Sequence, residues 1–231
     1  MTVLAAIQEA CGVIPLRQPS SVFGSSDREA LELQRLANTV GRRIARAYEW
    51  QELTTLATIN GNGATTAFAL PADYYKMPRD TKLWSSKLEQ PYSHIMSLDA
   101  WLEMEVRSFN NIIGRWIIIG NMIEIRPAPA SGETINYYYL SNNFVTSAAG
   151  PTANIFAADG DTFRLSETLL ALAMIWQWRA NKGLPYAENM QDYEDEKERE
   201  IAKNRGPRLL LVGEQRLPVD AVYALPIVVT P

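Results

Sequence analysis

The stretch RWIIIGNMIEIRPAPASGETINYYYL, residues 115–140, predicts three β-strands in succession. In the first strand Ile117 and Ile119 face one way and Ile118 the other, and Ile123 and Ile125 resume the alternation after the turn. Between them lies Gly120-Asn121, a dipeptide that is typical of a tight turn between strands. Pro127 and Pro129 end the second strand, because proline cannot donate a hydrogen bond to a neighbouring strand. The third strand is expected over residues 134–140, which are rich in aromatic side chains.

The sequence before this stretch continues the β pattern. Strand-forming residues lie on both sides of Asn60-Gly61-Asn62-Gly63, and this pattern predicts a hairpin. Short strands are expected in KLWSS and PYSHIMS, and a short helix over Leu98–Val106. Residues 54–140 are therefore predicted to form a mostly antiparallel sheet.

Helical patterns precede this β segment. A short helix is expected from Thr2 to Cys11, with Gly12 as its end. A long helix is expected from Asp27 to about Leu53, because apolar residues recur there at steps of three and four. Ser26 and Glu29 have the spacing of a capping box at its start.

Two more helices are predicted after the β segment. Ser166 is the expected N-cap of the first, and Gly183 its end. Its middle, LLALAMIWQW, is apolar nearly all round, so we expect it to be covered on several sides. The second runs from about Tyr186 to Asn204 and is strongly acidic, with Asp195 and Arg199 spaced for an ion pair.

These patterns predict an α+β protein. Residues 1–53 and 141–205 form a helical bundle, and residues 54–140 are an inserted antiparallel β domain. Residues 206–231 contain four prolines and many apolar residues, so we expect an extended C-terminal tail rather than a helix.

Composition limits the classes of function. Of the 231 residues 47% are hydrophobic, which is enough for a substantial core, and the formal net charge of −4 argues against a general nucleic-acid binder. One cysteine excludes an intrachain disulfide. No signal peptide and no membrane span are recognised, so we expect a protein that is not exported.

Few residues have the chemistry of a catalytic or metal site. His94 is the only histidine, and no nucleophile motif accompanies it, so we interpret it as a structural or surface residue. Cys11 is interpreted as a small packing residue. Asp159 and Asp161 have two interpretations, a metal site or a turn before a helix, and the turn is favoured because an EF-hand would need more oxygen ligands. The sequence therefore predicts no enzyme, no cofactor and no metal site.

Two charged stripes have a possible role in binding. One face of the long helix carries Arg28, Arg35, Arg42 and Arg46. The last predicted helix, from about Tyr186 to Asn204, carries the acidic stripe. The stripes suit a ring in which the basic face of one copy meets the acidic face of the next. The alternatives are an ordinary solvated face, with Glu32 paired to Arg28 and Arg35, or two helices that meet within one subunit.

The tail also has two interpretations. A proline-rich apolar segment either wraps its own domain or docks on a partner, and we favour the partner. The residues expected to bind there are Leu209, Leu210, Leu211, Val222, Tyr223 and Leu225.

Over residues 27–205 the chain resembles the head-to-tail adaptor proteins of tailed bacteriophages, also called connector or tail-tubular proteins. The resemblance depends on the Leu-Pro-x-Asp-Tyr turn at 70–74 and on the Gly-Asn hairpin that ends in Ile-Arg-Pro-x-Pro. It also depends on the Asp-x-Asp stretch that leads into two helices across KGLPYA.

The resemblance implies a structural virion protein at the capsid–tail junction. Members form a homo-oligomeric ring, commonly a dodecamer, under the portal protein, and DNA passes through the lumen without specific binding. The implied partners are the portal protein and a downstream tail or nozzle protein. The β segment is interpreted as a docking or wall-building module, suited to a large assembly by its sheet edges and by the aromatic side chains of Trp116, Tyr137, Tyr138 and Tyr139. The main alternative is a β-rich module that binds sugar or protein and is carried on a helical oligomerisation unit, which exposed aromatics would serve equally well. A second alternative is a hydrolase with scattered acids.

Overall fold

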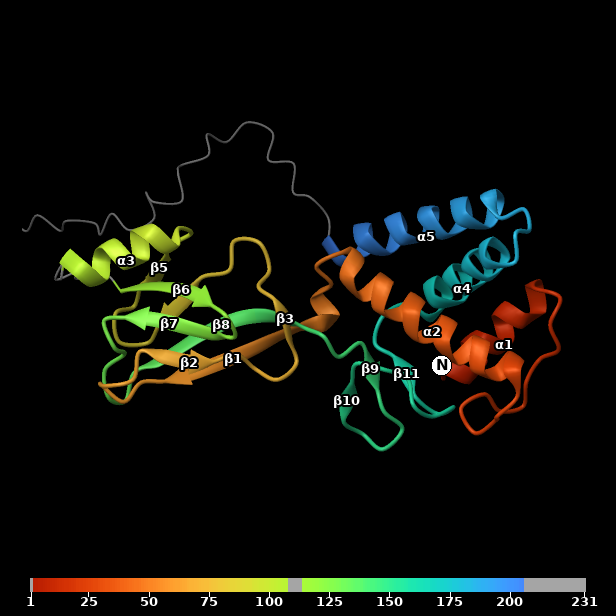
Figure 1. Ribbon diagram of the computed structural model, residues 1–231, viewed down its shortest axis with the longest axis horizontal. Coiled ribbons are helices and arrows are strands. Elements are labelled where there is room, and N and C mark those ends of the chain that lie inside the picture. Colours follow the sequence, from red (N-terminus) through yellow and green to blue (C-terminus); the bar gives the residue numbers. More distant parts are fainter. Residues whose placement is uncertain (1, 108–113, 206–231) are drawn as a thin grey trace, which may run out of the picture.

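The computed structural model describes residues 2–107 and 114–205, and it divides into a helical part and a β part that lie side by side along the long axis (Figure 1). The predicted α+β class is confirmed. The helices are α1 (Val3–Val13), α2 (Arg28–Ala47), α3 (Leu98–Arg107), α4 (Glu167–Asn181) and α5 (Ala187–Arg205), with a 3-10 turn at Gln51–Leu53.

The strands are short in most cases. Their bounds are β1 (Thr54–Asn60), β2 (Ala67–Ala69), β3 (Tyr74–Lys76), β4 (Leu83–Ser85), β5 (Pro91–His94), β6 (Arg115–Ile119), β7 (Met122–Arg126), β8 (Thr134–Ser141), β9 (Val145–Thr146), β10 (Thr152–Ala153) and β11 (Thr162–Phe163).

Helix α4 lies at the centre of the helical part and contacts α1, α2 and α5. Ser166 caps its start, as predicted, by accepting a hydrogen bond from the backbone N–H of Leu169 at 3.3 Å. Gly183 follows its end with a φ of +69°, a conformation that favours glycine. The apolar residues of α4 are buried on several sides, so the expected burial of this helix is confirmed.

A cluster of three phenylalanines joins α2 to the segment before α4. The ring centroids of Phe144, Phe156 and Phe163 lie 5.7–6.1 Å apart. Gly41 of α2 faces this cluster, and a Cβ atom at that position would lie only 3.0 Å from the Phe144 ring and 3.2 Å from the Phe156 ring. Glycine therefore allows the backbone of α2 to approach the cluster closely.

The predicted start of α2 at Asp27 is confirmed to within one residue, but its predicted capping box and its predicted end were wrong. The N-cap residue is Asp27, which makes no side-chain capping hydrogen bond, so the capping box of Ser26 and Glu29 does not form. The helix ends at Ala47 and not at Leu53. The indole N–H of Trp50 folds back and donates to the carbonyl of Ile44 at 2.8 Å, which satisfies one of the last free carbonyls of the helix.

The β part is one rolled sheet around its own core. The strand order is β1-β8-β4-β5-β6-β7-β2, with β3 also paired to β8. Among the described strands the pairs are antiparallel except β5 with β6. Residues from both halves of the sheet are buried together: Ile59, Leu70, Leu83, Tyr92, Trp116, Ile123, Ile125, Ile135, Tyr137 and Tyr139.

The predicted hairpin across residues 60–63 was wrong, although the one across Gly120-Asn121 is confirmed. Strand β1 pairs with β8 along its whole length, and β2 pairs with β7. The loop between them is held by the Asn62 side chain, which accepts hydrogen bonds from the N–H groups of Ala64 and Thr65. A seven-residue pairing with β8 buries more than a short hairpin with β2, so the distant partner is preferred.

The Leu-Pro-x-Asp-Tyr turn has a structural function. Both carboxylate oxygens of Asp73 accept hydrogen bonds at the end of β8, from the Tyr139 hydroxyl at 2.8 Å and from the Ser141 hydroxyl at 2.6 Å. The backbone N–H of Asn142 donates to the carbonyl of Asp73. This turn therefore fixes the point at which the chain leaves the β part for the helical part.

A three-stranded sheet of β9, β10 and β11 lies in the region that was predicted to be helical. Asp161 is buried beside it and accepts hydrogen bonds from the N–H groups of Ala148, Ala157 and Ala158 at 2.7–3.0 Å. Asp159 accepts from Val22, Phe23 and the Ser21 hydroxyl. The turn interpretation of the two aspartates is therefore supported, since their oxygens are taken up by the fold.

Asp161 should make stability depend on pH. Burial alone would raise the pKa of Asp161, but the three backbone N–H groups and the Ser147 hydroxyl outweigh it and lower the pKa below its ordinary value. The stabilisation is therefore complete above about pH 4, the ordinary value, and is lost as the pH falls through the native pKa. We expect Asp161→Asn to lower the free energy of unfolding at pH 7 by about 1–3 kcal/mol.

The measurement is denaturant unfolding of both proteins between pH 7 and pH 3. The difference should shrink below about pH 4, where Asp161 becomes protonated in the unfolded chain. Asp99→Asn, at an exposed position of α3, is the control and should change little. A constant difference over this range would contradict the assignment.

The contact at Gly41 gives a second prediction. Gly41→Val places a branched side chain against the phenylalanine cluster, so we expect the free energy of unfolding to fall by about 1–3 kcal/mol through overpacking. Gly12→Ala is the matched control, because its nearest neighbour atom is 3.8 Å away and alanine favours a helix. Thermal unfolding of the two variants checks the pair, and equal midpoints would show that α2 does not need the close approach.

Candidate functional site

The four arginines of the basic stripe, Arg28, Arg35, Arg42 and Arg46, all lie on exposed positions of α2. The predicted placement on one solvent-facing side is confirmed; their function as a binding surface is considered below. The guanidinium of Arg46 lies over the ring of Tyr75, 5.1 Å from its centroid.

Glu32 does not neutralise this stripe. Its carboxylate bonds the ammonium of Lys182, just after the end of α4, at 2.8 Å, so the pairs with Arg28 and Arg35 that were one alternative are absent from the described structure. A fifth arginine, Arg43, was missed from the sequence. It donates to the Gln177 side chain at 2.5 Å and lies over the ring of Trp176 at 5.6 Å.

A groove runs between α2 and α4 beside the stripe. It has a volume of about 480 Å³, and Arg28, Arg35 and Arg43 contribute to its walls. Leu31 also borders it and is 41% exposed. The groove therefore offers positive charge together with an apolar surface.

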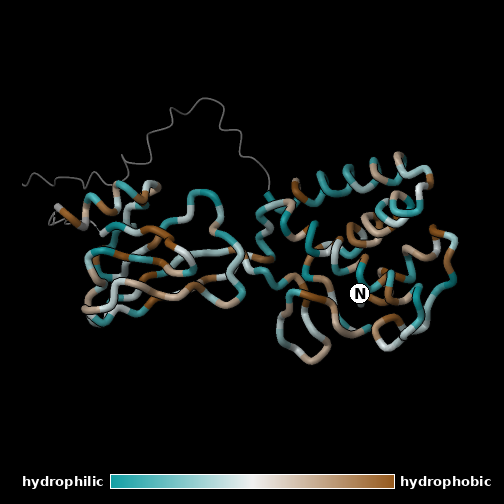
Figure 2. The backbone as a smooth tube through the Cα atoms, viewed as in Figure 1, coloured by the Kyte–Doolittle hydropathy of each residue, from teal (hydrophilic) through white to brown (hydrophobic). Residues whose placement is uncertain are grey.

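The acidic stripe lies on α5, which is mostly hydrophilic along its length (Figure 2). Three of its acids pair with cations three residues later, in the pairs Glu194–Lys197, Glu196–Arg199 and Glu200–Lys203. Arg199 therefore pairs with Glu196 and not, as predicted, with Asp195. Four acids remain exposed, and they recur at steps of four and three: Glu188, Asp192, Asp195 and Glu198.

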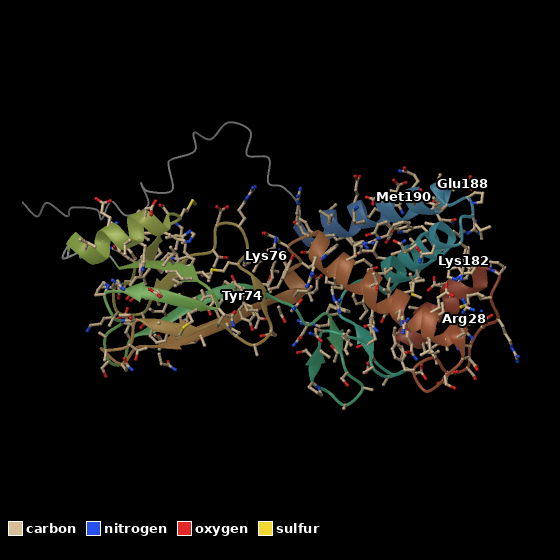
Figure 3. All side chains as sticks on the ribbon, in the orientation of Figure 1. Arg28, Tyr74, Lys76, Lys182, Glu188 and Met190 are labelled. Carbon is tan, nitrogen blue, oxygen red and sulfur yellow. The ribbon has the colours of Figure 1, made fainter. Side chains whose placement is uncertain are left out.

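The two stripes do not neutralise each other within one subunit. Helices α2 and α5 both pack on α4, and Arg28 and Glu188 lie apart on opposite sides of the helical part (Figure 3). In the described part of the chain no ion pair joins an arginine of the stripe to an acid of α5. The C-terminal end of α5 meets the segment after α2, where Arg205 donates to the Tyr48 hydroxyl at 3.0 Å.

Most of the aromatic residues expected to be exposed are in the core. Trp116, Tyr137 and Tyr139 are buried and only Tyr138 is exposed, because alternate side chains of a strand point to opposite faces of the sheet. Tyr138 lies opposite Leu56 on β1, and the neighbouring strand β4 adds Trp84. This patch of Leu56, Trp84 and Tyr138 was not predicted from the sequence. The position of Trp84 was the available signal, because it stands between two buried residues of a short strand and so faces outward.

Helix α3 presents a second apolar surface. Trp101 anchors the helix on the sheet, with its indole N–H bonded to Glu124 at 3.1 Å. On the other side Leu98, Leu102 and Val106 are 57–77% exposed at steps of four residues. Both faces of this helix are apolar. A second apolar face on a short helix was the signal in the sequence that could have indicated this surface.

The buried carboxylates show no sign of acid–base chemistry. Glu133 accepts from the Ser85 and Tyr92 hydroxyls and from the N–H of Ala130. Burial raises its pKa, but these hydrogen bonds and Lys87 outweigh burial and lower it. A carboxylate that is held ionised in this way stabilises the fold and is poorly suited to donate a proton.

The remaining chemistry-bearing residues have structural environments. His94 stacks on Trp116 with ring centroids 4.2 Å apart, and burial lowers its pKa. Cys11 is buried in α1, and burial, with a smaller effect of Glu29, raises the pKa of its thiol. Within residues 2–107 and 114–205, His, Cys, Asp and Glu form no group of three that could hold a metal ion.

No helix among the described residues has the length and apolar character to cross a membrane. The tail residues expected to bind a partner, Leu209, Leu210, Leu211, Val222, Tyr223 and Leu225, lie outside the described residues.

No curated protein matches the chain. The family model for the SU10 adaptor protein matches residues 1–220, which includes the stretch 27–205 and both charged stripes. The chain therefore belongs to the SU10 adaptor protein family, a family of phage head-to-tail adaptors.

Proposed function

We propose that the protein forms a ring under the portal vertex, joins capsid to tail there, and forms part of the channel through which DNA leaves. The observation that carries the proposal is the pair of exposed stripes, basic on α2 and acidic on α5, which no ion pair joins in the described part of the chain. Membership of a phage adaptor family supports the structural role.

The two stripes define a contact of one copy with the next. A surface that is complementary to a different surface of the same molecule makes a head-to-tail contact, and such contacts close into a ring when the rotation permits. Tyr186 and Met190 are about 40% exposed near the start of α5, beside the acids. They match the groove between α2 and α4, where arginines surround the exposed Leu31.

The β part serves a different contact. We propose that residues 54–140 form a domain inserted into the helical unit of residues 1–53 and 141–205. Helix α3 lies on the side of the β part away from the helices (Figure 1), and its exposed Leu98, Leu102 and Val106 suit contact with a downstream tail protein. The distal tail, with Val222, Tyr223 and Leu225, is assigned to the portal protein.

The charge of the chain fits a channel for DNA. With 22 Lys and Arg against 26 Asp and Glu, the chain has a formal net charge of −4, so as a whole it repels phosphates rather than attracting them. Proteins that pair many cations with phosphates bind DNA strongly at low salt, and such binding would slow its passage. The channel is therefore proposed to pass DNA without a specific site and to need no cofactor.

The binding-module alternative has one observation in its favour. Trp84 and Tyr138 are about half exposed on one sheet face, with Asn136 between them in the register, and aromatic rings beside amides suit a sugar. This alternative requires no fixed place in a virus particle.

Copy number in the particle separates the two functions. We expect quantitative peptide mass spectrometry of purified virions to find this chain at a fixed low copy number, close to that of the portal protein. Absence from the virion, or hundreds of copies, would reject the ring and favour the binding module.

Charge reversal tests the proposed contact between copies. We expect Arg35→Glu with Arg42→Glu to lower incorporation into particles at least tenfold, because like charges then face each other across every subunit contact. Asp192→Arg with Asp195→Arg should do the same. Combining all four changes in one chain should restore most of the incorporation, since every contact regains opposite charges.

The control is Lys82→Glu with Lys87→Glu, which makes the same change in net charge as the arginine pair at exposed positions of the β part. It should assemble normally. If the variant with all four substitutions is folded but as defective in incorporation as either pair alone, the two stripes do not face each other in the ring.

A further inference from the structure

The patch of Leu56, Trp84 and Tyr138 forms the floor of a groove of about 760 Å³ on the outer face of the sheet. The three side chains are 54%, 45% and 55% exposed and come from three adjacent strands, β1, β4 and β8. Contiguous apolar surface of this kind is uncommon on a free protein face and marks a site of contact.

The walls of the groove are fixed by hydrogen bonds. One wall is the loop of residues 78–82, and Glu49 anchors it by accepting from the Lys76 ammonium and from the backbone N–H of Arg79, each at 3.0 Å. The backbone N–H of Arg79 has the largest effect on the pKa of Glu49 and lowers it, and Lys76 lowers it further. Together they outweigh burial, which would raise the pKa, so the carboxylate stays ionised at neutral pH. Gln51 contributes to a second wall of the groove.

The last described residues of α5 end at this second wall. The backbone N–H of Gln51 donates to the Asn204 side chain at 2.9 Å, and the same side chain donates to Glu52 at 2.5 Å. Arg205 donates a hydrogen bond to the hydroxyl of Tyr48, which lies three residues before Gln51 in the sequence. The chain therefore leaves the described structure at the edge of the groove.

The sequence that follows has the composition to fill it. Residues 209–212, Leu-Leu-Leu-Val, come four to seven residues after Arg205. At about 3.3–3.6 Å per extended residue they reach about 13–25 Å from the end of α5. That reach covers the groove from Gln51 across Leu56 towards Trp84.

We propose that residues 209–212 of the same chain bind in this groove as an apolar clasp that ties α5 to the β part. A short tether gives the segment a high effective concentration at a groove next to its own anchor, so it outcompetes a free partner. The rim charges Glu49, Arg79, Asp80 and Lys82 balance one another, which suits a largely neutral occupant. The clasp restricts the outward-reaching arm of the proposed function to residues beyond Gly213.

A cysteine pair tests the clasp in the full-length chain. We expect Leu56→Cys with Leu210→Cys to form an intrachain disulfide under mild oxidation at least tenfold faster than Met96→Cys with Leu210→Cys. Met96 is 91% exposed and lies outside the groove, so it reports random encounters of the tail. Peptide mass spectrometry identifies which two cysteines are linked. Each single-cysteine variant is oxidised alone to show whether its new cysteine forms a disulfide with the buried Cys11.

Mixing separates the possible occupants. A chain with Leu56→Cys alone, mixed with a chain carrying Leu210→Cys alone, should give no linked dimer. A linked dimer would mean that the tail of a second copy fills the groove, and equal rates for the two cysteine pairs would mean that residues 209–212 do not bind there. Either result overturns the clasp, and neither bears on the copy number in virions that tests the proposed function.

Discussion

The need to cover α4 determines the arrangement of the helical part. This helix is apolar nearly all round, and each uncovered side would leave Leu, Met or Trp side chains in water at about 25 cal/mol for each Å². Helices α1, α2 and α5 supply the cover from different sides. Because each covering helix turns its apolar face to α4, its polar face must point outward. The arginines of α2 and the acids of α5 therefore face solvent, and in the described part of the chain no ion pair joins the two sets.

The β part satisfies the same need in a different way. It closes a sheet on its own core, so it does not depend on α4 for burial. The two parts are joined where the chain enters β1 and leaves β8, and Asp73 fixes the exit by bonding Tyr139 and Ser141. A sheet that is complete in itself has its outer face free. Leu56, Trp84 and Tyr138 on that face, and the outer side of α3, are therefore available for contacts that the helices cannot make.

Sequence patterns predicted the elements well and their partners less well. Local signals found α4, because Ser166 and Gly183 act on their own helix, and found the hairpin at Gly120-Asn121. The pairing of β1 with β8 was missed, because it joins residues about 80 positions apart and the Asn-Gly pattern between β1 and β2 favours a local turn. Which side chains of a strand are exposed could be predicted only once it was known which face of the sheet covers the core. Tyr138 faces outward because its neighbours in the strand, Tyr137 and Tyr139, face the core. Glu32 was assigned to its own helix, since Lys182 comes close only when α4 packs on α2.

Two kinds of contact follow from this division, and they differ in physical character. The stripes are exposed charges, whose attraction is screened beyond about 10 Å at 0.1 M salt. The groove on the β part is apolar, and burial of such surface is not weakened by salt. In the proposed ring the charged contacts set the register of one copy on the next, because misaligned copies bring like charges together. In the proposed clasp the contact of residues 209–212 with the β part is apolar, so salt that weakens the contacts between copies leaves it in place.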